Sequence, residues 1–195
     1  MKKQLLFLVL MMLPVVASAI TEIDGIYYNL NSGTQTAEGT IQMRKKYSGD
    51  LVIPSSVTYN GVEYSVTGIL GNAFAKSTDF TSVTIPSSVT SIDTRRTSYG
   101  LFDGCTSLTT VVLDGGNAVY DSRENCNAII ETASNTLLYG CNGSTIPNGV
   151  VGIGEYAFTG NSCITYISIP NSVTTIDKNA FKNCTNLAKV ELNFG

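Results

Sequence analysis

Apolar residues recur in one fixed register after each of four phenylalanines, Phe74, Phe102, Phe158 and Phe181. A large apolar residue stands six positions after each phenylalanine, a β-branched residue nine positions after it, and another aliphatic residue eleven positions after it. Agreement among four copies predicts a repeat architecture with units of about two dozen residues. The residues in this register are Phe80, Val83 and Ile85, then Leu108, Val111 and Leu113, then Ile164, Ile167 and Ile169, and finally Leu187, Val190 and Leu192.

Each unit is expected to contribute one short strand. The apolar positions nine and eleven residues after each phenylalanine alternate with outward-facing residues, which is the period of a half-buried strand. Isoleucine-proline pairs then force the chain to turn, because proline lacks the amide donor that strand pairing needs. A single unit cannot bury its own apolar face, so the units must stack. We therefore predict a mostly β solenoid of short parallel strands, with the Ala-Phe pairs on short helical turns.

Four units and two irregular segments divide the chain. Residues 51–117 hold repeats 1 and 2, and residues 144–195 hold repeats 3 and 4. Residues 20–50 contain strand-like segments around a turn-rich linker, and we predict a hairpin that caps the solenoid core. Residues 118–143 break the register with two apolar runs around a polar turn, which predicts a β-hairpin insert.

The insert carries two of the five cysteines. If Thr132 faces Asn135 across a two-residue turn, then Ile130 faces Leu137 and Cys126 faces Cys141. We hypothesise a disulfide between Cys126 and Cys141, with two free thiols as the alternative. The remaining cysteines follow their phenylalanines at short spacing and are expected to be small buried side chains; they are Cys105, Cys163 and Cys184.

The N-terminal residues 1–19 have the organisation of a secretory signal peptide. Two lysines precede an apolar run, and Ala17-Ser18-Ala19 forms a small-residue cleavage site. The apolar run is shorter than the roughly 20 residues of a membrane-spanning helix, so we predict no membrane span. We expect an exported protein that is extracellular or on the outer cell surface, with the periplasm as an alternative.

Charge and chemistry favour binding over catalysis. The net charge of −3 argues against a nucleic-acid partner, which requires a concentrated basic face. The sequence has no histidine, which removes Ser-His-Asp catalysis and the usual catalytic zinc ligands. We predict no enzymatic activity, no cofactor and no metal, although a two-carboxylate glycosidase stays formally open. The carboxylates considered for it are Asp103, Asp114, Asp121, Glu124 and Glu131.

The unit at residues 169–190 reads Ile-Pro-x-Ser-Val-Thr-x-Ile and then Ala-Phe-x-x-Cys-Thr-x-Leu-x-x-Val. This pattern resembles the BspA-type (Treponema pallidum-type) leucine-rich repeat of bacterial surface proteins, and the resemblance covers residues 51–113 and 145–192. The segment from Cys126 to Cys141 is similar to a hairpin insert of many Bacteroides members. The resemblance implies a leucine-rich-repeat solenoid that is secreted or surface-exposed, and some members are adhesins for host matrix proteins or other bacteria. The family shares no set of binding residues.

We expect the outward side of the parallel strands to contact an extracellular protein or glycan, including host matrix components. An alternative is a structural protein that self-associates through its C-terminal edge, because no polar closing segment follows the last predicted strand. A shortened family member without independent function is a further alternative. The expected contact residues are Ser82, Thr84, Thr110, Val112, Tyr166, Ser168, Lys189 and Glu191.

Overall fold

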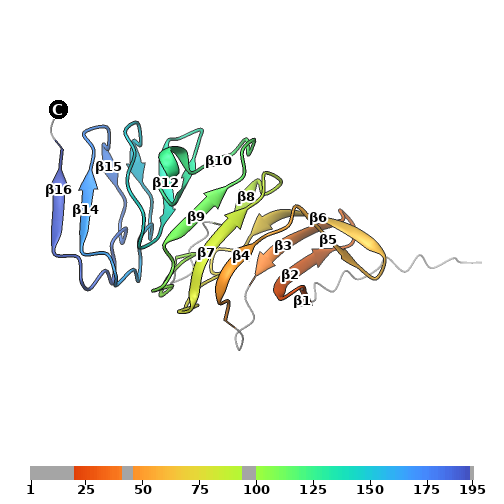
Figure 1. Cartoon of the computed structure of the whole chain (residues 1–195). Helices are drawn as coiled ribbons and strands as arrows, with labels where there is room; N and C mark the ends of the chain where they lie inside the picture. The colour runs from red at the N-terminus through yellow and green to blue at the C-terminus, as the bar shows by residue number, and fades with distance from the viewer. Residues whose placement is uncertain (1–19, 41–45, 94–99, 194–195) are drawn as a thin grey trace, which may run out of the picture.

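The computed structural model describes residues 20–40, 46–93 and 100–193. The predicted signal peptide lies outside these residues. The described chain is a stack of short strands with one three-residue 3₁₀-helix, Arg123–Asn125, and its strands lie side by side from β1 to β16 (Figure 1). The predicted mostly β solenoid is confirmed. None of the helical structure in the described ranges is long and apolar enough to cross a membrane.

A five-stranded path covers the N-terminal end of the stack. Strands β1, β2 and β3 form an antiparallel meander, and β3 then pairs in parallel with β6, which pairs with β5. The side chains of Tyr28, Ala37 and Val66 are fully buried beneath it, so this sheet covers one end of the core. The sequence pattern predicts a cap from residues 20–50 alone, whereas β5 and β6 of this sheet come from the segment assigned to the first two repeats. The strands are β1 (Ile20–Ile23), β2 (Ile26–Asn31), β3 (Thr36–Thr40), β5 (Ser56–Tyr59) and β6 (Val62–Ile69).

The strands predicted in the four units are all present, but they form two separate parallel sheets. The first panel consists of β4, β7 and β9, and the second panel consists of β14 and β16. Strands β9 and β14 do not pair with each other. The first panel contains β4 (Gly49–Val52), β7 (Phe80–Ile85) and β9 (Thr110–Leu113), and the second contains β14 (Tyr166–Ile169) and β16 (Lys189–Leu192).

Short strands also pair on the opposite side of the coils. Strand β8 pairs with β6, and β12, β13 and β15 pair in parallel. We call the sheet of β12, β13 and β15 the back sheet. The hairpin of β11 and β12 extends it, and β10 pairs with β11 at its edge. These strands are β8 (Ser91–Ile92), β10 (Tyr120–Asp121), β11 (Ala128–Glu131), β12 (Thr136–Gly140), β13 (Gly152–Ile153) and β15 (Thr175–Ile176).

The predicted phenylalanines stack along the core. The ring centroids of Phe74 and Phe102 are 5.9 Å apart, and those of Phe158 and Phe181 are 5.1 Å apart. Tyr139 of the insert packs edge-on against Phe102 at 6.3 Å, so an aromatic ring from β12 continues the stack where the register breaks. The Ala-Phe pairs lie in hydrogen-bonded turns rather than on helical turns.

The cysteine three residues after a phenylalanine ties neighbouring coils together. The Cys105 thiol donates to the Phe74 carbonyl at 2.9 Å, and the Cys184 thiol donates to the Phe158 carbonyl at 3.0 Å. Cys105 is buried and Cys184 is half-buried, but Cys163 is exposed. The prediction of burial was therefore wrong for Cys163, which lies five residues after its phenylalanine and outside the repeated position.

A β-bulge changes the pairing inside the insert. Ile130 faces Leu137 as predicted, but four residues rather than two form the loop, and the bulge lies between Ile129 and Ile130. Beyond it, Ala128 faces Gly140, so Cys126 and Cys141 are not cross-strand partners. The predicted register was wrong here, and the structure holds both cysteines as free buried thiols instead of a disulfide.

The last unit is less covered than the register predicts. Val190 is 48% exposed and Leu192 is 51% exposed, whereas the corresponding Val83 and Ile85 of the first unit are fully buried. Ile176 on the back sheet is also 50% exposed. Within the described residues, these three half-exposed side chains form an apolar edge along β15 and β16.

Candidate functional site

The structure sorts the eight predicted contact residues into two groups of four. In the first panel, Ser82 lies beside Thr110 and Thr84 lies beside Val112. In the second panel, the corresponding neighbours come from β14 and β16. All eight alternate along their strands with apolar residues, but they do not share one sheet, and their role in contacting a partner stays a prediction. The second-panel pairs are Tyr166 with Lys189 and Ser168 with Glu191.

An aspartate on β4 organises the first panel. The Asp50 carboxylate accepts hydrogen bonds from the hydroxyls of Ser82 and Thr81, each at 2.7 Å. These bonds, that from Ser82 foremost, lower the pKa of Asp50 below its usual range. The sequence pattern assigns Asp50 to the N-terminal cap, whereas the structure places it on panel strand β4. The Ile53-Pro54 pair that follows is the sequence signal that marks Gly49–Val52 as a panel strand.

The second panel carries a half-exposed aromatic ring with two charged partners. Tyr166 is 47% exposed, and the Lys189 ammonium lies 5.3 Å from its ring centroid. Glu191 accepts hydrogen bonds from the Tyr166 hydroxyl and the Lys189 ammonium, each at 3.0 Å. The bond from Lys189, and then that from Tyr166, lower the pKa of Glu191, and the same carboxylate raises the pKa of Lys189. The charges of this group are therefore paired within the panel.

Residues 122–127 separate the two panels. The Asn127 side-chain oxygen accepts from the Val111 amide at 3.3 Å, and the Ser122 hydroxyl donates to the Val111 carbonyl at 3.1 Å. Two side chains thus occupy the place of a neighbouring strand along β9. A crevice of about 210 Å³ remains beside them. Its lining consists of Thr110, Val111, Val112, Leu113, Ser122, Asn125 and Asn127.

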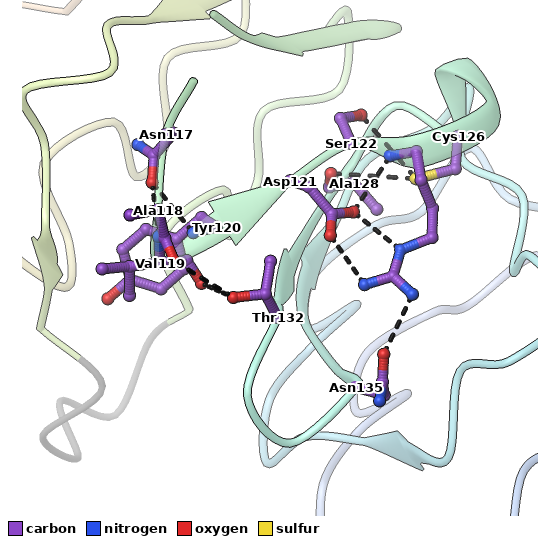
Figure 2. A network of polar contacts seen from close by, with 11 residues as sticks. Asn117, Ala118, Val119, Tyr120, Asp121, Ser122, Cys126, Ala128, Thr132 and Asn135 are labelled. Carbon is purple, nitrogen blue, oxygen red and sulfur yellow. Dashed lines mark hydrogen bonds and ion pairs between the residues drawn. The ribbon is translucent and has the colours of Figure 1, made fainter. Parts of the chain in front are cut away.

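Residues 122–127 form a wedge between the two panels, and an arginine links this wedge to the hairpin of β11 and β12. The Arg123 guanidinium donates to both Asp121 oxygens, at 2.9 and 2.6 Å, and to the Asn135 side-chain oxygen at 2.9 Å (Figure 2). Burial acts to raise the pKa of Asp121, but the hydrogen bonds from Arg123 outweigh it and lower the pKa. Asp121 is thus held in an ion pair, and its role is to anchor the 3₁₀-helix that forms the wedge.

A second crevice lies between residues 144–146 and β14. It measures about 140 Å³, and no charged side chain lines it. Ile146-Pro147 is one of the isoleucine-proline pairs, so a panel strand would be expected at residues 144–146. On one side of residues 144–146, the wedge takes the place of a neighbouring strand. The Thr145 main-chain amide donates there to the Cys126 carbonyl at 3.0 Å. The crevice is lined by Ser144, Thr145, Ile146, Tyr166, Ile167 and Ser168.

The carboxylates gather differently from the sequence prediction. Of the five considered, Glu131 lines a cavity of about 350 Å³ on the back sheet, together with Glu155 and Asp177. Glu155 also pairs with Lys178 at 3.4 Å. Sequence reasoning missed Glu155 and Asp177, which lie two residues after Ile153 and one residue after Ile176, respectively; these unequal spacings gave no common signal. In the ranges that the structure describes, no three His, Cys, Asp or Glu side chains are arranged to hold a metal ion.

Two other predicted carboxylates have structural surroundings. Burial raises the pKa of Asp103, with Lys76 and Lys182 acting in the opposite direction. Asp114 begins a turn in which the main-chain amide of Asn117 donates to the main-chain carbonyl of Asp114 at 3.3 Å. The Asn117 side-chain oxygen accepts from the amides of Val119 and Tyr120 (Figure 2). Its side-chain nitrogen donates to the carbonyls of Pro86 and Val89, at 3.4 and 2.8 Å, so this loop joins neighbouring coils.

Comparison with known proteins gives matches to repeat proteins of bacteria. The family model described as "BspA type Leucine rich repeat region" matches residues 53–126 and 127–194, with six copies. These ranges include the segment that we predicted as an insert. A search of curated proteins found no matching relative.

Solved structures of leucine-rich-repeat proteins are similar to this chain. A protein from Bacteroides ovatus matches 88% of this chain at 25% identity with a TM-score of 0.53, and this chain spans 41% of that protein's length. A protein from Bacteroides capillosus matches 90% of this chain and 99% of its own length at 25% identity, with a TM-score of 0.45. The T. pallidum leucine-rich-repeat protein matches 88% of this chain and 71% of its own length at 22% identity, with a TM-score of 0.45.

Proposed function

Because the chain belongs to the family of BspA-type leucine-rich-repeat proteins, we propose that it is a secreted or cell-surface module that binds an extracellular protein or glycan. The role is adhesin-like, and it requires binding rather than catalysis. Export rests on the signal-peptide pattern of residues 1–19. Host matrix proteins and mucosal glycans are the partners proposed for it.

The outward face of the two panels is the observation that carries this proposal. Val112 is 43% exposed and Tyr166 is 47% exposed, and both stand among hydroxyl-bearing side chains on strands fixed from below by a packed core. Aromatic and other apolar contact groups within a polar rim occur at protein interfaces, and these two residues supply such groups, one on each panel. A rigid face of this kind binds without the entropy loss of ordering a loop.

Binding to immobilised fibronectin, laminin, collagen and mucin tests the proposal. We expect Val112→Asp to weaken capture by about tenfold, since a charge placed in the contact must be desolvated. Val62→Asp is the matched control, because Val62 is a 37% exposed strand valine of the N-terminal sheet. Equal effects of the two substitutions, or no capture by any of these partners, would contradict binding through the panels.

The apolar edge at β15 and β16 favours a second candidate function, self-association. Three half-exposed side chains lie there: Ile176, Val190 and Leu192. The outer edge of β16 also presents main-chain groups that can pair with another strand. Light scattering over a concentration series should then detect larger particles, and Leu192→Glu should abolish them. A particle mass that stays constant with concentration would exclude this candidate.

A further inference from the structure

We propose that the crevice between residues 144–146 and β14 is a subsite for one neutral sugar unit of a glycan. The inference rests on the proposed binding function and specifies its ligand. Three features of the crevice lead to it: main-chain groups without protein partners, a lining without charge, and an adjacent half-exposed aromatic ring.

The main-chain groups come from β14. In the pairing with β16, the amides of Lys189 and Asn193 donate to the carbonyls of Thr165 and Ile169, at 3.2 and 3.0 Å. Along a parallel strand, successive residues direct their main-chain groups to opposite sides. The amides and carbonyls of Tyr166 and Ser168 therefore point away from β16, toward the crevice.

These groups are not used by the neighbouring coil. In the first panel, by contrast, β7 and β9 are joined by a continuous ladder of main-chain hydrogen bonds from Ser82 to Ile85. Within the part of the chain that the structure describes, no main-chain hydrogen bond joins residues 144–146 to β14. Both segments nevertheless line the same crevice of about 140 Å³. Main-chain polar groups require a partner. Water can serve when the site is empty, and ligand hydroxyls can replace that water.

The lining selects the class of ligand. The side chains of Ile146 and Ile167 are apolar, and the others carry hydroxyl groups or the Tyr166 ring. An ionic ligand would lose its hydration in this crevice without meeting an opposite charge, which is unfavourable. A neutral polyol can instead both donate to the carbonyls and accept from the amides, as a sugar does with each hydroxyl.

The Tyr166 ring adds the contact that a pyranose needs. The Tyr166 hydroxyl donates to Glu191, the Lys189 ammonium lies over one face of the ring, and the ring remains 47% exposed beside the crevice. A pyranose presents C–H groups on one face and hydroxyls around its edge, so one face can pack on an aromatic ring while the edge hydroxyls enter a polar crevice. Apolar contact with a few convergent polar groups is the usual composition of a small-ligand site.

A glycan array probed with the purified chain, followed by titration of the bound glycan, tests this inference. We expect neutral glycans to bind, and Tyr166→Ala to weaken the best of them by about tenfold, the order expected for losing one aromatic contact. Tyr166→Phe keeps the ring and should retain most of the affinity. Tyr59→Ala is the matched control, because Tyr59 is a 39% exposed strand tyrosine in β5.

Thr145→Val adds a second test within the crevice, since it removes a lining hydroxyl while keeping the shape of the side chain. It should also weaken the bound glycan, with an unchanged melting temperature. Binding only to acidic glycans, no glycan binding, or equal affinity of Tyr166→Ala and the unmodified chain would each overturn the inference. If matrix proteins are captured through Val112 while neutral glycans are not, the sugar subsite alone is refuted. If neither is captured, the proposed function fails as well.

Discussion

Gly140 on β12 is a position where one added methyl group should destabilise the whole stack. A Cβ atom at Gly140 would lie 2.7 Å from Cζ and 2.8 Å from Cδ1 of Phe158, and nearer still to Cε1. The Phe158 ring is 1% exposed and stacks on Phe181 with an interplanar angle of 5°. The ring cannot withdraw without breaking this stack, so Gly140→Ala must displace either the ring or the strand.

Two opposing effects determine the magnitude. Replacing glycine by alanine restricts the unfolded chain, which stabilises a protein by about 0.4–1 kcal/mol where the backbone permits it. Overpacking a filled core destabilises by about 1–3 kcal/mol. The Gly140 amide also donates to the Ala157 carbonyl at 2.9 Å, which limits relaxation of the strand. We therefore expect a net loss of about 1–2 kcal/mol.

Chemical denaturation of a double-mutant cycle measures this effect. Phe158→Ala alone should destabilise by about 3–5 kcal/mol. In its presence, Gly140→Ala should lose its penalty, since the new methyl group then enters the vacated space, and the coupling should be about 1–3 kcal/mol. Gly115→Ala is the control, because nothing lies within 4 Å of a Cβ there. A Gly140→Ala variant as stable as the unmodified chain, or effects that simply add, would refute the packing argument.

The remaining predictions concern a carboxylate and the thiols. The lowered pKa of Asp50 stabilises the fold above the ordinary aspartate pKa of about 3.9, and this contribution disappears as the pH falls through the lower folded value. Asp50→Asn should thus flatten the acid side of the stability curve, and an unchanged curve would refute the role of its hydrogen bonds. Thiol titration should detect five free thiols. The exposed Cys163 should react first, since burial raises the pKa of Cys105 to about 12 and also raises those of Cys126, Cys141 and Cys184. A count of three would restore the Cys126–Cys141 disulfide.

The sequence by itself determined the coil. Which residues face inward depends on the alternation and spacing inside one unit, and this information is local. The stack from Phe74 to Phe102, the strands near Val83 and Ile167, and the turns at isoleucine-proline pairs all follow from it. The eight outward residues could be chosen for the same reason, because each one alternates along its strand with an apolar position of the register.

Only the tertiary structure decided how coils meet. The bulge at Ile130 changes the cross-strand partners of Cys126 without changing any hydrophobic position, so the pattern carries no sign of it. The wedge at residues 122–127 divides the predicted face, because the side chains of Ser122 and Asn127 satisfy Val111 in place of a strand. Pairing between coils depends on where the chain returns after an insertion, and that is set by contacts between residues far apart in sequence. The crevices of the candidate site arise at those junctions, which is why the register of the repeats could not reveal them.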